Sequence, residues 1–301
     1  MHWLQNHWYR ITPLHLILLP VSLVFRALVA FRRAAFRNQV FSSDRLLLPV
    51  IVVGNISVGG TGKTPLTLAL AQQLVERGWH PLIVSRGYGG KTQRPQQVSA
   101  SSTAQQVGDE PLLMARRDIC PVWIGRDRAA TAHAAMQAHP QSDIVLCDDG
   151  LQHYRLQRDV EVAVVDGARG FGNGLLLPAG PLREPVARLQ SVDAVVINNG
   201  STLPGQFAMH LCGELFYNLL DPGQTAAADQ FHATRNHAVA GIGHPQRYFQ
   251  HLEKIGISFT PHAFPDHHPY TTNDLAFADC DAILLTEKDA VKCTMFADAR
   301  Y

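Results

Sequence analysis

The sequence lacks a surplus of charge of either sign. Its 301 residues contain 26 Lys and Arg against 25 Asp and Glu, a formal net charge of +1. A whole-surface attraction to nucleic acid needs a strongly basic protein, so we expect no nucleic acid among the partners. Any basic patch would have to be local.

Cysteine is scarce and scattered. The five cysteines lie at positions 120, 147, 212, 280 and 293, and no two of them form a C-x-x-C pair. This spacing argues against a disulfide scaffold and against a structural zinc site. It is typical of a chain that folds in a reducing compartment.

The N-terminal stretch lacks charge, because no Asp, Glu, Lys or Arg occurs between Ile11 and Phe25. Arg26 ends this run short of the roughly 20 residues that a spanning helix needs, and Pro20 is expected to kink the helix or start it afresh. A helical wheel puts Arg26, Arg33 and Arg37 on one side. The apolar residues on the other side are Ile17, Val21, Val24, Leu28 and Phe31.

Such a helix is typical of a membrane interface, where its arginines lie near anionic head groups. The alternative is an amphipathic helix that packs on the protein's own core.

Beyond residue 44 the sequence alternates between short apolar runs and stretches of helical spacing. The expected strands lie at 46–54, 80–85, 120–125, 143–149, 161–166 and 193–198, and a second alternation begins at 237–243. This pattern predicts an α/β fold with a mostly parallel sheet of the P-loop NTPase type, followed by a second, smaller α/β domain. The predicted domains are 1–43 (membrane-associating helix), 44–200 (nucleotide binding) and 201–301 (second domain, contributing to the substrate cleft).

The stretch "GNISVGGTGKTP" (54–65) follows an apolar strand and precedes a helical stretch. Backbone N–H groups of a glycine-rich turn converge on phosphate there, and the helix N-terminus adds partial positive charge. Lys63 is expected to reach the β- and γ-phosphates, and Thr64 to bind Mg²⁺. Ser57 replaces the first glycine of the P-loop pattern. The expected nucleotide-binding residues are Ser57, Val58, Gly59, Gly60, Thr61, Gly62, Lys63 and Thr64.

The run "DIVLCDDG" (143–150) predicts a strand that ends in carboxylates, as in the Walker B arrangement. On a regular strand Asp148 and Asp149 would point to opposite faces. We expect one to serve the metal and the other the nucleophile or a supporting contact, and spacing does not say which.

A nucleotide site alone permits a motor, a switch or a kinase. No Asn is followed by Lys, so the N-K-x-D guanine signature of GTPases is missing. A kinase needs a group that takes the proton of the acceptor hydroxyl. "GDEP" (108–111) and "FPDHH" (264–268) contain candidates, although a lone Asp or His in a loop carries little weight by itself.

Seven strings occur in order: "GNISVGGTGKTP", "SRGYGG", "GDEP", "DDGLQH", "LPAGPLREP", "FPDHHPY" and "TEKDAVK". Together they resemble the tetraacyldisaccharide 4′-kinases, the lipid A 4′-kinases of Gram-negative bacteria, from the N-terminal helix to about residue 293. The resemblance implies transfer of the ATP γ-phosphate to the 4′-hydroxyl of a tetraacylated glucosamine disaccharide 1-phosphate. It also implies a place at the cytoplasmic face of the inner membrane, either peripheral or anchored by a single helix.

The resemblance assigns roles to matching positions. Lys63 and Thr64 match the phosphate lysine and the magnesium threonine, and Asp109 matches the general base, with His267 as its partner. The acidic pair Asp148 and Asp149 lies near the metal. Other matches are His153, which completes "DDGLQH", and Arg183 and Glu184, near nucleotide and substrate. The γ-phosphate would meet Lys63, Mg²⁺ and an arginine such as Arg86 or Arg183.

Two rival functions stay open at this point. One is a membrane-associated P-loop ATPase or metallochaperone-type switch, although Val58 stands where such switches carry a second lysine. The other is a nucleotide-binding scaffold without catalysis. The family usually continues past "TEKDAVKC" with a further strand and helix, so a shortened second domain is expected.

Overall fold

The computed structural model describes residues 7–92 and 94–301, which form two compact units. Unit 1 comprises Met1–Arg86, Gln93–Gln97 and Asp118–Leu211, and unit 2 comprises Gly87–Thr92, Val98–Arg117 and Cys212–Tyr301. The units are interleaved in sequence, since two segments between 87 and 117 group with the C-terminal third. The contiguous domain boundaries drawn from the sequence stay a prediction.

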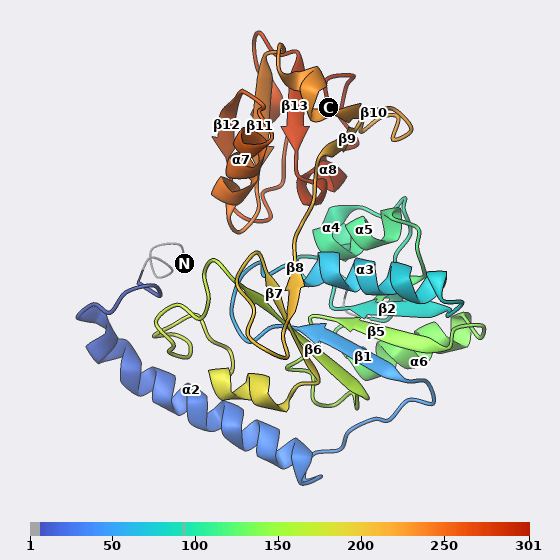
Figure 1. The fold of residues 1–301 in the computed structure, drawn as a ribbon. Helices are drawn as coiled ribbons and strands as arrows, with labels where there is room; N and C mark the ends of the chain where they lie inside the picture. Colours follow the sequence, from blue (N-terminus) through green and yellow to red (C-terminus); the bar gives the residue numbers. More distant parts are fainter. Residues whose placement is uncertain (1–6, 93) are drawn as a thin grey trace. The chain divides into compact units, whose positions relative to one another are not determined.

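Unit 1 is built on an eight-stranded sheet with the strand order β3-β4-β2-β5-β1-β6-β7-β8 (Figure 1). All neighbours pair in parallel except β3 and β4. The strands are β1 (Val50–Gly54), β2 (Pro81–Ser85), β3 (Gln96–Gln97), β4 (Val122–Ile124), β5 (Ile144–Asp148), β6 (Val160–Asp166), β7 (Ala194–Asn198) and β8 (Phe207–Met209).

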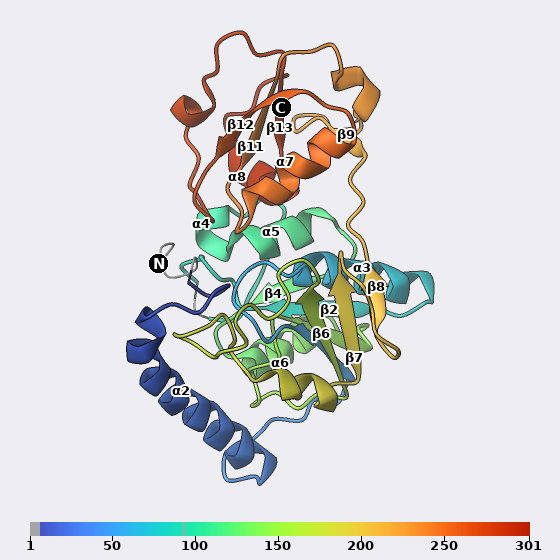
Figure 2. The ribbon, with the colours of Figure 1, turned by 60° about the vertical axis from the view of Figure 1, so that its left-hand side comes forward.

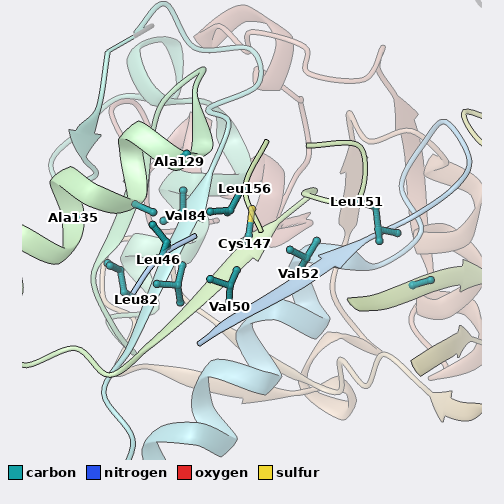
Figure 3. Packing of buried hydrophobic residues seen from close by; sticks show 13 residues of the cluster. Leu46, Val50, Val52, Leu82, Val84, Ala129, Ala135, Cys147, Leu151 and Leu156 are labelled. Atoms are coloured by element: carbon teal, nitrogen blue, oxygen red, sulfur yellow. The ribbon is translucent and has the colours of Figure 1, made fainter. Parts of the chain in front are cut away.

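Helices α3 (Lys63–Glu76) and α6 (Arg128–Ala138) cover opposite faces of this sheet. Because successive strand residues alternate between faces, Val50 and Val52 of β1 pack with the alanines of α6 (Figure 3). Val53 packs on the other side, with Leu66 and Leu70 of α3. The continuous apolar strands of the sequence are thus explained by burial on both faces.

Unit 2 contains a small parallel sheet, β12-β11-β13, formed by β11 (Asn236–Ala240), β12 (Phe259–Ala263) and β13 (Ala282–Leu285) (Figure 2). A β-ribbon of β9 (Leu215–Tyr217) and β10 (Thr225–Ala227) is antiparallel. The helices are α4 (Ala104–Val107), α5 (Asp109–Arg116), α7 (Pro245–Lys254) and α8 (Glu287–Cys293), with short 3₁₀ turns η2 (Ala228–Phe231) and η3 (Thr272–Leu275); a further one, η1 (Val186–Ser191), belongs to unit 1.

Helix α2 (Leu14–Arg37) runs through Pro20 and past Arg26. The apolar run is therefore part of a 24-residue helix, whose most apolar 18-residue window has a mean hydropathy of 2.2. Among the described residues it is the one helix that is long and apolar enough to cross a membrane. The helix does not start afresh at Pro20, which lies inside α2 and removes one backbone hydrogen bond from it.

One face of α2 packs on the rest of unit 1, and another face is exposed to solvent. The Ser22 hydroxyl donates to the Leu176 carbonyl at 2.8 Å, and Arg33 donates to Ser191 at 2.7 Å. The apolar residues that the helical wheel grouped together are all exposed, at 73% (Ile17), 54% (Val21), 61% (Val24), 61% (Leu28) and 65% (Phe31). The alternative of a helix packed on its own core therefore fails for this face.

Candidate active site

The P-loop of residues 57–62 joins β1 to α3 and is held by its neighbours. Gly62 has a φ of 97°, and a Cβ there would lie 2.5 Å from Asn198 Nδ2. Asn198, at the end of β7, donates to the Thr61 carbonyl at 2.9 Å. The Val58 N–H donates to the Pro181 carbonyl at 2.8 Å, so "LPAGPLREP" also supports the loop. The glycine is required by backbone conformation and by close approach together.

Lys63 opens α3 and faces a carboxylate. Its Nζ lies 3.5 Å from Asp149 Oδ1, and Arg183 NH1 lies 3.4 Å from Asp149 Oδ2. Burial raises the pKa of Asp149, but the charges of Lys63 and Arg183 outweigh it and lower that pKa to about 2. Two cations and one carboxylate thus gather at the start of α3.

The two aspartates do not point to opposite faces as a regular strand predicts. Strand β5 ends at Asp148, and Asp149 turns away with a positive φ of 49°. Asp148 accepts hydrogen bonds from Thr67 (3.1 Å) and Ser85 (3.4 Å), while Asp149 reaches Lys63. Both carboxylates therefore lie against α3, because the turn rotates the second one back toward the helix.

The donor set suits magnesium. Thr64 of α3 is 7% exposed and Asp148 of β5 is 1% exposed. A hydrogen bond from Thr67 to Asp148 holds the helix and the strand together at this point. In the described part of the chain no group of three His, Cys, Asp or Glu could hold a metal alone. Mg²⁺ normally takes one or two protein oxygens and completes its shell with water and phosphate, so hydroxyl and carboxylate oxygens fit it.

Glu184 is buried in a polar network. It is 1% exposed, and it accepts hydrogen bonds from Gln152 (2.7 Å) and Tyr154 (2.6 Å). Its carboxylate also lies 3.3 Å from Arg188 Nε. The same Gln152 amide donates to the Asn55 carbonyl just before the P-loop, at 2.9 Å. The geometry therefore makes Glu184 a support for the loop backbone, and its predicted contact with nucleotide stays a prediction.

Unit 2 brings Asp109 and His267 together, although 158 positions separate them in sequence. Asp109 is the first residue of α5 and is 7% exposed. His267 Nδ1 lies 2.9 Å from Asp109 Oδ2, and the His267 N–H donates to the Gly241 carbonyl at 3.2 Å. The imidazole is thus fixed at its backbone and at its ring.

Two lysines of α8 face the acidic start of α5. Lys292 Nζ lies 3.7 Å from Asp109 Oδ2 and 2.8 Å from Asp289, and Lys288 Nζ lies 3.1 Å from Glu110. Burial raises the pKa of Asp109, but the hydrogen bond with His267 and the charge of Lys292 lower it overall. Asp109 is therefore a permanently ionised carboxylate at neutral pH.

A pocket of about 420 Å³ lies beside α2 within unit 1. Its walls hold Arg32 and Phe36 of α2 together with Arg126, Asp127, Arg128, Arg155 and His153, and Asp127 pairs with Arg155 at 2.7 Å, so the arginines outnumber the carboxylate. Burial and the charges of Arg128 and Arg86 lower the pKa of His153 to about 3, so the imidazole is neutral in a positive field. The pocket favours an anionic ligand.

Sequence reasoning missed these arginines and both lysines. The lysines lie in "TEKDAVK", a string that was noted but carried no assigned role. The arginines of "GRDR" (125–128) follow β4, whose carboxyl end meets the same sheet edge as the P-loop. Convergence of parallel strand ends at one edge is the signal that could have found them.

A sequence model of the family described as tetraacyldisaccharide-1-P 4′-kinase matches residues 14–301. The chain belongs to this family. A protein from Methylobacillus flagellatus named tetraacyldisaccharide 4′-kinase is 50% identical to this chain over 295 residues, which are 98% of this chain and 88% of the relative. One from Dechloromonas aromatica is 51% identical over 300 residues (97% and 88%).

A crystal structure of LpxK from Aquifex aeolicus in complex with ATP superposes with a TM-score of 0.79 at 28% identity. The superposition covers 92% of this chain and 90% of the Aquifex aeolicus chain. The expectation of a kinase-family α/β fold with an apolar N-terminal helix is confirmed.

Proposed function

We propose that this tetraacyldisaccharide 4′-kinase family member transfers the γ-phosphate of ATP to the 4′-hydroxyl of a tetraacyldisaccharide 1-phosphate in lipid A biosynthesis. The observation that carries a kinase, rather than an ATPase or a scaffold, is the Asp109–His267 pair at 2.9 Å. Hydrolysis needs only an oriented water, whereas transfer to a sugar hydroxyl is helped by a positioned base.

The nucleotide half of the reaction belongs to unit 1. Backbone N–H groups of residues 59–62 surround the phosphates, while the Val58 N–H stays on the Pro181 carbonyl, and Lys63 leaves Asp149 to neutralise charge on the γ-phosphate. Arg183, the second cation on Asp149, stands ready for the same exchange. Thr64, with Asp148 or Asp149, would hold Mg²⁺, which supplies charge neutralisation of the phosphates when bound.

The acceptor half belongs to Asp109. As the 4′-oxygen bonds to phosphorus, the bond from phosphorus to the bridging oxygen breaks and ADP leaves. The hydroxyl proton passes to Asp109, whose Oδ2 is engaged by His267 and Lys292, so Oδ1 is the oxygen that takes it. The two contacts fix the orientation of the carboxylate, and positioning is most of what phosphoryl transfer requires.

A labelling experiment tests the function. The protein is incubated with γ-labelled ATP, Mg²⁺ and tetraacyldisaccharide 1-phosphate in detergent micelles, and we expect label on the lipid. Label released only as free phosphate would support the ATPase alternative. Bound ATP with neither product would support the scaffold.

The exposed apolar face of α2 supports the proposal that the enzyme lies on the membrane, at its cytoplasmic side where ATP is available. Replacing Val24 and Leu28 by Glu should release the protein from anionic vesicles. Each apolar side chain contributes about 1.5–3 kcal/mol when it leaves water, so we expect binding to fall roughly 10²-fold or more. Vesicle sedimentation measures it.

Both side chains are 61% exposed, so the change should leave the melting temperature near that of the wild type. Met295→Glu, at an 89% exposed position outside α2, is the matched control and should sediment normally. Unchanged sedimentation of the double variant would refute the anchor.

The arginine pocket suits the 1-phosphate that the acceptor carries. Arg126 is an exposed residue of its wall, so Arg126→Gln should spare the fold. We expect KM for the acceptor to rise roughly tenfold, the worth of one charge-assisted contact, with kcat little changed. Steady-state kinetics measure both constants.

With an acceptor that lacks the 1-phosphate, Arg126→Gln and the wild type should have the same KM. Arg77→Gln, at an exposed arginine after α3, serves as the control. An equal rise in KM for both acceptors would refute the assignment of the 1-phosphate to this pocket.

A further inference from the structure

Arg169 lies against the P-loop from a neighbouring strand. It follows the end of β6, which pairs with β1, and its side chain is 19% exposed. One NH group donates to the Gly60 carbonyl. A Cβ added to Gly59 would lie 3.0 Å from Arg169 NH1, so the guanidinium rests directly on the third and fourth residues of the loop.

A buried carboxylate holds this arginine from behind. Asp166, the last residue of β6, has a side chain that is 3% exposed, and its Oδ2 accepts from Arg169 Nε at 2.8 Å. Its Oδ1 accepts from the Ala168 and Arg169 N–H groups, at 3.1 and 3.2 Å. The turn and the side chain are therefore fixed by one residue, which leaves the outer NH groups directed at the loop.

In the contact with Gly60 the charged guanidinium of Arg169 donates to one neutral carbonyl oxygen. A guanidinium bonds anionic oxygens bidentately and more strongly than it bonds a neutral acceptor. The P-loop is also where the terminal phosphate of a bound triphosphate lies. A phosphate oxygen would thus be a better partner than the Gly60 carbonyl, and the change requires only a movement of the guanidinium.

We propose that Arg169 is an intramolecular arginine that contacts the γ-phosphate and stabilises its charge during transfer. This inference rests on the proposed function of the P-loop. It gives the site a cation besides Lys63 and Arg183, anchored by Asp166 as neither of those is. It also accounts for the glycine at 59, because a side chain there would occupy the space of the guanidinium.

The first test is binding without turnover. We measure the affinity of wild type, Arg169→Lys and Arg169→Met for Mg²⁺·ADP, alone and with aluminium fluoride, which mimics the transferring phosphoryl group. Both variants should bind ADP within about twofold of wild type, and should lose roughly 10² in the tightening that fluoride produces. Arg45→Met is the control, because Arg45 is 74% exposed and pairs only with Asp159 at the surface among the described contacts.

A purely structural arginine predicts the reverse. If Arg169 only braces the loop, ADP affinity and melting temperature fall in Arg169→Met, recover in Arg169→Lys, and the fluoride effect persists. That outcome would overturn the proposal. Arg169→Lys keeps a charge beside Asp166, so a folding defect in the Met variant does not remove the test.

The second test is kinetic. Arginines on transferring phosphates are worth up to about 10³–10⁵ in kcat, and with other cations present we expect a loss of roughly 10² in Arg169→Lys with an unchanged KM for ATP. Guanidinium added to an Arg169→Gly variant should restore part of kcat. If aluminium fluoride tightens ADP binding to the wild type but no label reaches the lipid, the proposed acceptor is wrong and the role of Arg169 is retained. If the Arg169 variants show the same fluoride effect and kcat as the wild type, the role of Arg169 is refuted and the proposed function is not affected.

Discussion

Lys63→Ala is expected to lower kcat/KM roughly 10³-fold, because the lysine serves bound ATP and the transition state alike. Its Nζ is 3.5 Å from Asp149, so the variant also loses the strongest charge that keeps the pKa of that carboxyl low. A carboxylate that keeps only Arg183 as its ion-pair partner then faces the incoming triphosphate. Calorimetric titration with ATP and initial rates should show weaker affinity and slower turnover together.

Lys63→Arg separates charge from shape in this experiment. The guanidinium keeps the charge but is larger and planar, with its charge spread over three nitrogens, so we expect partial recovery of affinity with little recovery of kcat. Lys91→Ala is a control. Wild-type affinity for ATP in Lys63→Ala would contradict the nucleotide assignment of the P-loop.

Asp109→Asn should lower kcat by roughly 10²–10⁴, the usual contribution of a general base, and leave ATP affinity nearly intact. The amide keeps the size of the carboxylate and a contact for His267 but does not take the proton. Since the pKa of Asp109 lies below its ordinary 3.8, the wild-type carboxylate is ionised throughout the neutral range. The deficit of Asp109→Asn should therefore stay constant between about pH 6 and pH 8.

Glu110→Gln is the neighbouring control. Glu110 pairs with Lys288 at 3.1 Å, whereas Asp109 pairs with His267. We expect a small change in this variant, because one partly exposed ion pair contributes little. Turnover that survives in Asp109→Asn would assign the proton to another group.

The main sheet could be predicted because its signal is local. Val50, Val52 and Val53 belong to one apolar run, and the ends of the strands were placed within a few residues. Strand β1 begins four residues later than expected, since "LLLP" precedes the sheet and Leu47 is 96% exposed. The edge strands β3 and β8 escaped prediction, because two or three residues leave no periodicity to read.

The site was only half predictable, for a physical reason. Lys63 and Thr64 follow from a contiguous motif whose geometry is nearly fixed by its own backbone. The Asp109–His267 pairing joins positions 158 residues apart, and only the resemblance to a family supplied it. Lys292 and Arg169 matter through tertiary contacts, and nothing in their immediate sequence distinguishes them from ordinary surface cations.

Helix α2 supplies Arg32 and Phe36 to the arginine pocket and carries the bare apolar face as well. With α2 in the membrane interface as proposed, the depth to which the helix sinks into the lipid would set the height of the pocket above the acyl chains. An acceptor whose phosphate binds there as proposed would have to span that height, so the enzyme would select for how far a sugar protrudes from the bilayer. A lipid with a shorter head group would stay out of reach even if its phosphate were chemically suitable.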